Sequence, residues 1–323
     1  MVTLSDVAKM AGVTPMTVSR VVNSPELVKK ETREKVTKAM KSLGYVPNVA
    51  AKNLATNRTH IIDVYIPESI DLTNPFSMYC IVGVSEVLSK HYYSLMILRN
   101  LKKDHLCDGY IVTGLLRNEV NSFKNYASKK QRPFILFGHT DIDGIDYIDT
   151  DNVMGGRMAT DYLFDNGHNH IAMINVRENK DYAFDRMEGY KQSLSEHSQS
   201  INPRLVEEAE NSVEGGTKAM RRLLKKKGFS AVFCAIDTLA IGANIAIQEK
   251  GLNVPEDISL IGYDALGYEH LSSPEITSIH QPIIEISKKM AEVLIRKIEK
   301  NDTEVHEFIA PELKLGCSVK EIK

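Results

Sequence analysis

The stretch Leu4–Asn23, LSDVAKMAGVTPMTVSRVVN, predicts two short amphipathic helices joined by a tight turn. The first helix repeats apolar residues at i, i+3, i+4 and i+7, at positions Leu4, Val7, Ala8 and Ala11. Thr3 and Asp6 have the spacing of a capping box at its start, and Gly12 is expected to end it. This pattern is typical of a helix-turn-helix, in which the second helix enters the major groove of DNA.

The second helix has one inward and one outward stripe. Thr14 can cap this helix, and Pro15 suits its first turn, where no backbone donor is needed. Three valines are expected to point inward: Val18, Val21 and Val22. The opposite stripe offers an apolar tip, a hydroxyl, a guanidinium and an amide, from Met16, Ser19, Arg20 and Asn23. These groups can contact base edges and phosphates. The alternative is a helical hairpin inside an unrelated all-α domain.

The following residues make the assignment more specific. A third apolar stripe ends at Gly44 and consists of Val36, Ala39, Met40 and Leu43. The motifs VAKMAGVTPMTVSRVVN, ETREKV, LGYVPN and AAKNLA resemble the DNA-binding headpiece and hinge of the lactose-repressor (LacI/GalR) family. The resemblance is dense over the first sixty or so residues and sparser to the end. Lys29 departs from it, because the family usually has Ser or Thr there as a helix cap; Glu31 and Glu34 can compensate through the helix dipole.

The resemblance implies a headpiece over residues 1–47 and a hinge helix with linker over 48–60. The expected DNA contacts are Thr14, Pro15, Met16, Thr17, Ser19, Arg20, Asn23, Asn48, Ala51 and Leu54. We expect Arg20 to contact a guanine and Met16 a thymine methyl or another apolar edge, while Thr17, Ser19 and Asn23 mostly contact phosphates. Leu54 matches the leucine that the family inserts into the minor groove. The alternative for Leu54 is packing between paired hinge helices.

Charge is distributed unevenly along the chain. Residues 1–60 hold 10 of the 40 Lys+Arg but only 4 of the 42 Asp+Glu, although the whole chain has a net charge of -2. Positive charge is therefore concentrated in the segment expected to bind DNA. A solvated basic face is the alternative, but it gives no reason for the coincidence with a recognition helix. The length of 323 residues suits two or three domains.

Cysteine and histidine usage predicts neither disulfides nor a metal site. The four cysteines, at 80, 107, 234 and 317, lack paired spacing, and no signal peptide or long apolar span is evident. We therefore expect a reduced, cytoplasmic protein with no membrane contact and no cofactor. Gly167-His168-Asn169-His170 is interpreted as turn chemistry rather than a metal-ligand pair, because no third ligand is suggested nearby.

From Ile61 onward strands and helices alternate, which is typical of parallel α/β domains. The expected strands are IIDVYI, YSLMIL, DGYIVT, RPFILFG, DYIDTD, HIAMINV, LVEEAE, SAVFCAI and ISLIGYD. The fold class is therefore α/β, with an all-α helix-turn-helix headpiece and a body over 61–323 that has two parallel sheets. The two-lobed arrangement of this body resembles that of the family and of periplasmic binding proteins. The first lobe is expected to span 61–165 and 283–303, and the second 166–281 and 304–323. Only about nine residues follow Leu98 before the next strand, too few for a full crossover helix.

Polar side chains at strand ends suggest an effector site between the lobes. Where this sequence matches the family, the candidates are Asn74, Phe76, Asp151, Asn152, Arg186, Asp237 and Asp264. Arg186 and Asp264 together can bind sugar hydroxyls, with Phe76 stacking on the ring face. The alternative is that Arg186 simply pairs with an aspartate. Asp237 is the weaker match, because Ile236 stands where the family commonly has Asn.

These features predict a ligand-responsive transcriptional regulator, most simply a dimeric repressor of operator DNA controlled by a sugar. The alternative is a co-repressor-dependent regulator that responds to a non-sugar small molecule. A nicotinamide-dependent enzyme would need a G-x-G-x-x-G turn after its first strand, but IIDVYIPESIDLTNPF has no glycine. A solute-binding protein would need a secretory signal where the helix-turn-helix stands. No catalytic constellation is evident.

The chain shows no heptad segment at its end, which favours a dimer over a tetramer. A short hinge helix would form only when two copies meet on DNA.

Overall fold

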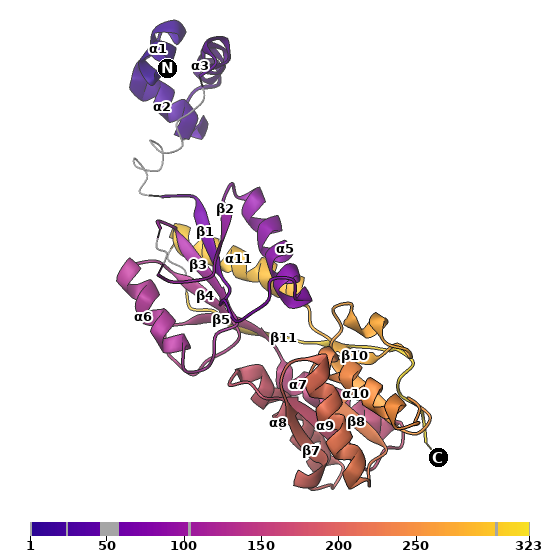
Figure 1. Cartoon of the computed structure of the whole chain (residues 1–323). Coiled ribbons are helices and arrows are strands. Elements are labelled where there is room, and N and C mark those ends of the chain that lie inside the picture. Colours follow the sequence, from indigo (N-terminus) through magenta and orange to yellow (C-terminus); the bar gives the residue numbers. More distant parts are fainter. Residues whose placement is uncertain (1, 24, 46–57, 103–104, 301–302, 323) are drawn as a thin grey trace. The chain divides into compact units, whose positions relative to one another are not determined.

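The computed structural model describes residues 2–23, 25–45, 58–102, 105–300 and 303–322. They fall into two compact units, Met1–His60 and Ile61–Lys323 (Figure 1). The second unit begins where the sequence changes from helical to strand periodicity. The expected hinge contacts Asn48, Ala51 and Leu54 lie outside the described residues.

The headpiece is a small helical bundle. Its elements are α1 (Leu4–Ala11), α2 (Pro15–Asn23), the 3-10 turn η1 (Pro25–Leu27) and α3 (Lys30–Leu43). The buried core takes two residues from each helix: Val7, Ala8, Val18, Val21, Val36 and Ala39. The other predicted inward residues of α1 and α3, Leu4, Ala11, Met40 and Leu43, are partly buried and pack against this core, which confirms the predicted inward faces; Val22 of α2 is also only half-buried.

Local hydrogen bonds fix the helix ends where the sequence predicts them. Thr3 and Asp6 form a reciprocal capping box, and Gly12 ends α1 in the left-handed conformation with φ 65°. The Thr14 hydroxyl accepts a bond from the backbone N–H of Thr17 at 3.2 Å. Lys29 gives α3 no side-chain cap, as expected, so that helix starts without this stabilisation.

The first lobe of the body is built on a six-stranded parallel sheet in the order β11-β5-β4-β3-β1-β2. Its strands are β1 (Ile61–Tyr65), β2 (Ser94–Leu98), β3 (Gly109–Thr113), β4 (Phe134–Phe137), β5 (Asp146–Thr150) and β11 (His306–Ile309). Its helices are α5 (Pro75–Lys90), α6 (Val120–Lys130) and α11 (Ile283–Lys300). Alpha-helix α11 packs in the same apolar cluster as α5, so the late helix returns to the first lobe as predicted (Figure 1).

The second lobe has the sheet order β12-β10-β9-β8-β6-β7, in which only β12 is antiparallel to its neighbour. Its strands are β6 (Ile171–Val176), β7 (Val206–Ala209), β8 (Ala231–Cys234), β9 (Ser259–Asp264), β10 (Thr277–His280) and β12 (Glu312–Lys314). Its helices are α7 (Asn152–Asp165), α8 (Asp181–Glu196), α9 (Val213–Lys226) and α10 (Asp237–Glu249), with short 3-10 turns η2 (Pro203–Leu205) and η3 (Tyr268–Leu271). The expected fold class is confirmed, since both sheets are mostly parallel and alternate with helices.

Two lobe boundaries differ from the prediction. The segment 152–165 was expected in the first lobe, but α7 buries Ala159 and Leu163 in the core of the second. Residues 304–323 were expected in the second lobe, but β11 pairs with β5 of the first. Periodicity indicates where a helix or strand lies, but not which of two similar sheets it joins. The chain therefore crosses between the lobes after β5, after β10 and after β11.

The connection between β2 and β3 has no helix in its described residues, as its shortness predicts. Arg99 instead donates to the carbonyl oxygens of Pro67 and Ile70, at 3.0 and 2.6 Å. Met96 and Ile97 of β2 remain exposed. One edge of the first sheet is therefore left with apolar side chains in solvent.

Within the described part of the chain, no helix combines the length and apolar character needed to cross a membrane.

Candidate DNA-contact helix and effector site

Two members of the predicted outward stripe of α2 are exposed. Met16 is 66% exposed and Arg20 is also exposed, while Thr17 and Ser19 are half-buried. Thr17 lies within hydrogen-bond distance of the Thr14 hydroxyl, at 2.9 Å between the two oxygens. An exposed apolar tip and an exposed guanidinium one helical turn apart can reach adjacent base edges.

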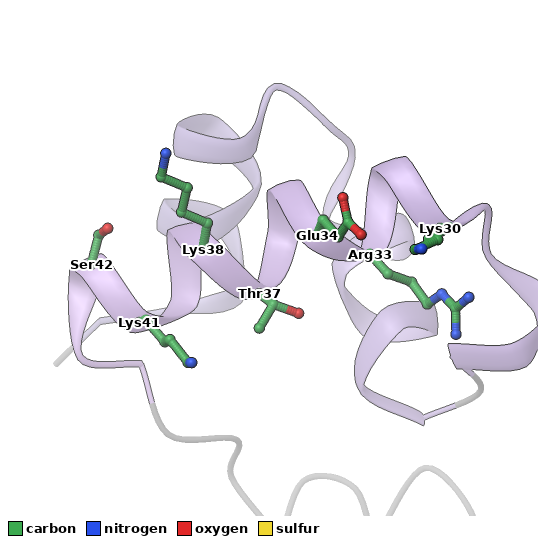
Figure 2. A pocket seen from close by; sticks show the side chains of 7 residues that line it. All are labelled: Lys30, Arg33, Glu34, Thr37, Lys38, Lys41 and Ser42. Atoms are coloured by element: carbon green, nitrogen blue, oxygen red, sulfur yellow. The ribbon is translucent and has the colours of Figure 1, made fainter.

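A second basic surface lies on α3. An open hollow of about 610 Å³ runs along this helix and is lined by Lys30, Arg33, Glu34, Thr37, Lys38, Lys41 and Ser42. Figure 2 shows these seven side chains on α3. All seven belong to one helix, so these residues form a single wall and do not surround a ligand. Four cations against one carboxylate add positive charge to the headpiece, which suits contact with a phosphate backbone.

In the body, Arg186 lies at the centre of the candidate effector residues. It comes from α8 and is 2% exposed. Its Nε donates to Asn152 Oδ1 at 3.0 Å, and its Nη1 donates to the Ala235 carbonyl at 2.5 Å. The guanidinium stacks 3.6 Å from the ring centre of Tyr263. Neither Tyr263 nor Ala235 was predicted, because the sequence gives no sign of which side chains meet across the sheet.

A closed ring of hydrogen bonds joins Arg186 to both segments that cross between the lobes near this site. Arg186 Nη1 donates to Asp264 Oδ1 at 3.3 Å, and Gln281 Nε2 donates to the same oxygen at 2.6 Å. Thr150 Oγ1 donates to Gln281 Oε1 at 3.2 Å. Asn152 Nδ2 donates to the Thr150 carbonyl at 3.0 Å, and Asn152 accepts from Arg186. The predicted residues Arg186, Asp264 and Asn152 thus meet, and Gln281 completes the ring.

Asp264 has both an unusual backbone conformation and a raised carboxyl pKa. Its φ of 119° lies in a region that side chains other than glycine rarely adopt, a strain that clusters at functional sites. Burial raises the pKa of its carboxyl to about 6, although Arg186 beside it acts in the opposite direction. About a quarter of the side chain, 26%, stays exposed. A partly exposed carboxylate on a strained backbone is suited to contact a ligand.

Asp237 has a different place. It is fully buried, and its carboxylate accepts from the Ser278 hydroxyl at 2.6 Å and from the backbone N–H of Ala265 at 2.8 Å. Burial raises its pKa well above the usual range. Both carboxylate oxygens of Asp237 accept hydrogen bonds from residues of the same lobe. Asp237 therefore has a structural role, in which it holds the loop that follows Asp264.

The remaining candidates lie at helix starts. Asn74 caps α5 by accepting from the backbone N–H of Phe76 at 3.0 Å, and Asp151 caps α7 by accepting from Met154 at 2.8 Å. The ring of Phe76 lies 5.0 Å from that of Phe137. Leu266, from the loop after Asp264, belongs to the same apolar cluster as Phe76. Phe76 and Asp264 therefore lie in adjoining parts of the two lobes.

One histidine, His168, has the structural role that was predicted for it. His168 is buried, with Nδ1 2.8 Å from the Ser230 hydroxyl and Nε2 3.1 Å from the Lys320 carbonyl, consistent with a structural turn. Sequence reasoning missed another group: ligand atoms of His139, Asp149 and Asp185 all lie within 4.8 Å of one another. They come from three separate segments, so no spacing in the sequence signals their proximity.

Comparison with known proteins agrees with the architecture of a helical headpiece and a two-lobed body. Residues 3–48 match the model of bacterial regulatory proteins of the lacI family, and residues 160–319 match a periplasmic binding protein-like domain. The HTH-type transcriptional regulator YvdE of Bacillus subtilis (strain 168) is 35% identical over 97% of this chain and 98% of its own length. The complex of the transcriptional regulator CelR with cellobiose is 29% identical, with a TM-score of 0.74 over 98% of this chain and 100% of that one.

The Lac repressor dimer bound to operator and the anti-inducer ONPF is 25% identical, with a TM-score of 0.82 over 99% of both chains. The similarity to it and to YvdE thus includes both the headpiece and the two-lobed body. The chain therefore belongs to the lacI family of bacterial regulatory proteins and is a DNA-binding transcriptional regulator.

Proposed function

We propose that this regulator is a repressor that binds operator DNA as a homodimer through α2, and that a small neutral sugar between the lobes lowers its affinity for that DNA. The ring of hydrogen bonds around Arg186 is the observation that carries this proposal. It places a cation and a carboxylate at the ends of strands and helices from distant parts of the chain. A ligand at such a position would touch both segments that connect the lobes there.

The chemistry of the ring suits hydroxyl groups. Arg186 and Gln281 both donate to Oδ1 of Asp264, and among the described residues no hydrogen bond to Oδ2 is found, so Oδ2 is the oxygen proposed to accept from a ligand hydroxyl. Asn152 and Arg186 supply donors beside it, and Phe76 supplies an aromatic face. A hydroxyl-rich ring can satisfy such polar groups without introducing a buried charge, whose cost would be several kcal/mol. Asp151 is proposed at the rim, and Asn74 and Asp237 support the site from behind.

The same ring would transmit the effect of ligand binding to the DNA-binding unit. Thr150 precedes the crossing into α7, and Gln281 follows β10 just before the crossing into α11. A ligand bound to Asp264 Oδ2 and to Asn152 would use the same two side chains that hydrogen-bond to these crossing residues, and would change the positions of those side chains. The angle between the lobes would then shift, and with it the pairing of two hinge segments in a dimer. Effector and operator binding are linked in this scheme, each weakening the other.

The similar proteins support the class of effector and partner. CelR is seen with cellobiose, and the Lac repressor is seen as a dimer on operator with an anti-inducer. We extend both features to this chain. We also propose that it acts by binding alone, without catalysis, and in the cytoplasm, where operator DNA is found.

A thermal-shift screen tests the site. Cellobiose, ribose and other neutral sugars are added to the wild type and to Asp264→Asn, Arg186→Lys and Arg157→Ala. A sugar at a hundred times its dissociation constant should stabilise the wild type by about 2.7 kcal/mol. The two site variants should lose this shift, whereas Arg157→Ala should keep it, because Arg157 forms exposed ion pairs on α7. A sugar shift of unchanged concentration dependence in Asp264→Asn would place the site elsewhere.

A further inference from the structure

Two cations of the first lobe lie against the start of α8 in the second. Arg117, after β3, places Nε 2.9 Å from Asp181 Oδ1, and its guanidinium lies 5.0 Å from the ring centre of Phe184. The backbone N–H of Arg117 also donates to the Asn179 carbonyl at 3.0 Å. These contacts join the lobes through residues that are not members of the ring around Arg186.

His139, after β4, lies between carboxylates of both lobes. Its Nδ1 is 3.1 Å from Asp149 Oδ2 on β5 and 3.6 Å from Asp185 Oδ2 on α8. Its Nε2 is 4.0 Å from Asp181 Oδ1. Phe308 of β11 packs against the imidazole ring, with 5.4 Å between ring centres. One imidazole therefore meets one carboxylate of its own lobe and two of the other.

We propose that Arg117 and His139 are positioning residues that hold α8 against the first lobe, and that the charge on His139 sets how firmly the lobes close. We call Arg117, His139, Asp181 and Asp185 the α8 latch. The idea rests on the proposed function in one respect: closure matters for regulation because Arg186, next to Asp185 on the same helix, is the central residue of the effector site. The latch would thus set the affinity of that site without touching the ligand.

The charges around the latch support a protonated imidazole. The hydrogen bond to Asp149 is the main cause that raises the pKa of His139 to about 9, with further contributions from the charges of Asp185, Asp149 and Asp181. Burial raises the pKa of Asp185 to about 6. The latch is therefore fully charged between about pH 6 and 9. Above that range the imidazole loses its proton, and below it Asp185 gains one.

The other ionisable groups near the latch differ in the sign of their charge. Those that act on its members are Asp141, Tyr147, Asp149 and Arg186. Arg186 favours the ionised form of Asp185, while Asp149 opposes it. Tyr147 is neutral at physiological pH like an ordinary tyrosine, and burial raises its phenol pKa further. His139 is thus the group of the latch whose charge changes at mildly alkaline pH.

A divalent cation is the competing occupant, since His139, Asp149 and Asp185 offer three suitable ligand atoms. The 3.1 Å separation between His139 Nδ1 and Asp149 Oδ2 is, however, a direct hydrogen-bond distance. A proton on the imidazole meets the carboxylates without any ion. This geometry favours a proton on Nδ1 over a bound metal ion, and the experiment distinguishes the two.

The test uses a reporter that needs neither effector nor DNA. The chain has no tryptophan, so Phe184→Trp introduces a single indole at the latch, where Phe184 is 50% exposed and lies beside Arg117. Opening of the lobes should expose the indole and shift its emission to longer wavelength. Emission is recorded from pH 6.5 to 9.5 in the full chain, with His139→Gln, Asp185→Asn and His270→Gln added to the reporter background. His270 pairs with Glu269 and Glu275 of its own lobe and is the matched control.

We expect a red shift with a midpoint near pH 9 in the reporter and in His270→Gln. His139→Gln should give red-shifted emission that no longer depends on pH, and Asp185→Asn should lower the midpoint towards ordinary histidine values. Emission that stays flat with pH, or a midpoint that His139→Gln leaves in place, would overturn the latch. A shift produced by added Zn²⁺ and reversed by chelator would also overturn it, in favour of a metal site. Sugar binding is measured separately in the thermal-shift screen. If no sugar binds, the pH dependence of the indole emission still tests the latch.

Discussion

Replacement of Arg186 by alanine should destabilise the body far more than replacement of an exposed arginine. Arg186 is 2% exposed, and its removal leaves the Asp264 carboxylate without its cation. Breaking a buried ion pair by deleting one partner costs about 3 to 5 kcal/mol, and lost stacking on Tyr263 adds to this. We expect a loss of about 4 kcal/mol in the free energy of unfolding. In a chain of this size each kcal/mol lowers the melting temperature by about 2 to 4 °C, so a drop of about 10 °C is expected.

The pH dependence separates this explanation from simple loss of packing. The pKa of Asp264 is raised to about 6, above its value in the unfolded chain, so its ionised form disfavours folding as pH rises through that value. Without Arg186 the pKa should rise further, and acid should relieve the defect. Thermal and urea unfolding of Arg186→Ala, with Arg157→Ala as control, should therefore show a smaller deficit at pH 5.5 than at pH 8. The control should lose less than about 1 kcal/mol, because its ion pairs are exposed.

A deficit equal to that of Arg157→Ala would show that the buried pair contributes little. A large deficit that is the same at both pH values would show that the unpaired carboxylate is not its cause.

Three further predictions concern the proposed DNA contacts and the packing behind the proposed effector site. Arg20→Ala should cost about 1 to 3 kcal/mol on a selected operator and relax preference at one base pair, whereas Lys38→Ala should weaken selected and random DNA alike; equal losses for Arg20→Ala on both would refute base readout. Leu54→Ala should reduce both affinity and DNA bending in gel phasing, and normal bending would reject the minor-groove wedge. Gly156→Ala would place a Cβ 2.9 Å from the Arg186 Cα across the α7–α8 contact, so it should cost about 1 to 3 kcal/mol in unfolding experiments and weaken the sugar shift. An unchanged melting temperature would mean that the helices separate easily.

The headpiece could be predicted closely because its determinants are local. A capping box, a helix-ending glycine and an apolar stripe each act within one or two turns, so Thr3, Asp6 and Gly12 fix α1 whatever the rest of the chain does. The absence of a cap at Lys29 was equally visible. Alternation of strands and helices likewise indicated the two sheets.

The lobe assignment of α7 could not be predicted in the same way. Its sequence predicts a helix, but the choice of sheet depends on close packing against α8, where a Cβ on Gly156 would come 2.4 Å from the Arg186 carbonyl oxygen. Adjacent glycines in an α/β crossover helix are a signal that could have been used. Strand β10 was likewise missing from the prediction, because Thr277–His280 is short and mixes polar with apolar residues.

The arrangement of the candidate effector residues was predicted in part. Arg186, Asp264 and Asn152 were found through motifs and do meet, whereas Asp237 proved to have both oxygens bonded within its own lobe. Gln281 was missed because its role appears only when two crossing segments are brought together. The α8 latch was missed for the same reason, although Asp181 and Asp185 share one helix face at a spacing of four.

The central claim is that a sugar bound at Arg186 controls DNA binding by α2. The direct measurement is fluorescence anisotropy of the full-length dimer on an operator selected from a random duplex library, with and without the sugar that gives the largest thermal shift. The account predicts a palindromic selected sequence, an affinity for it that the sugar lowers, and an Asp264→Asn variant that binds the sequence equally well but ignores the sugar. Failure to select any sequence would contradict the DNA-binding role of α2. An affinity that the sugar leaves unchanged would contradict the coupling, and one that the sugar raises would show a co-repressor instead.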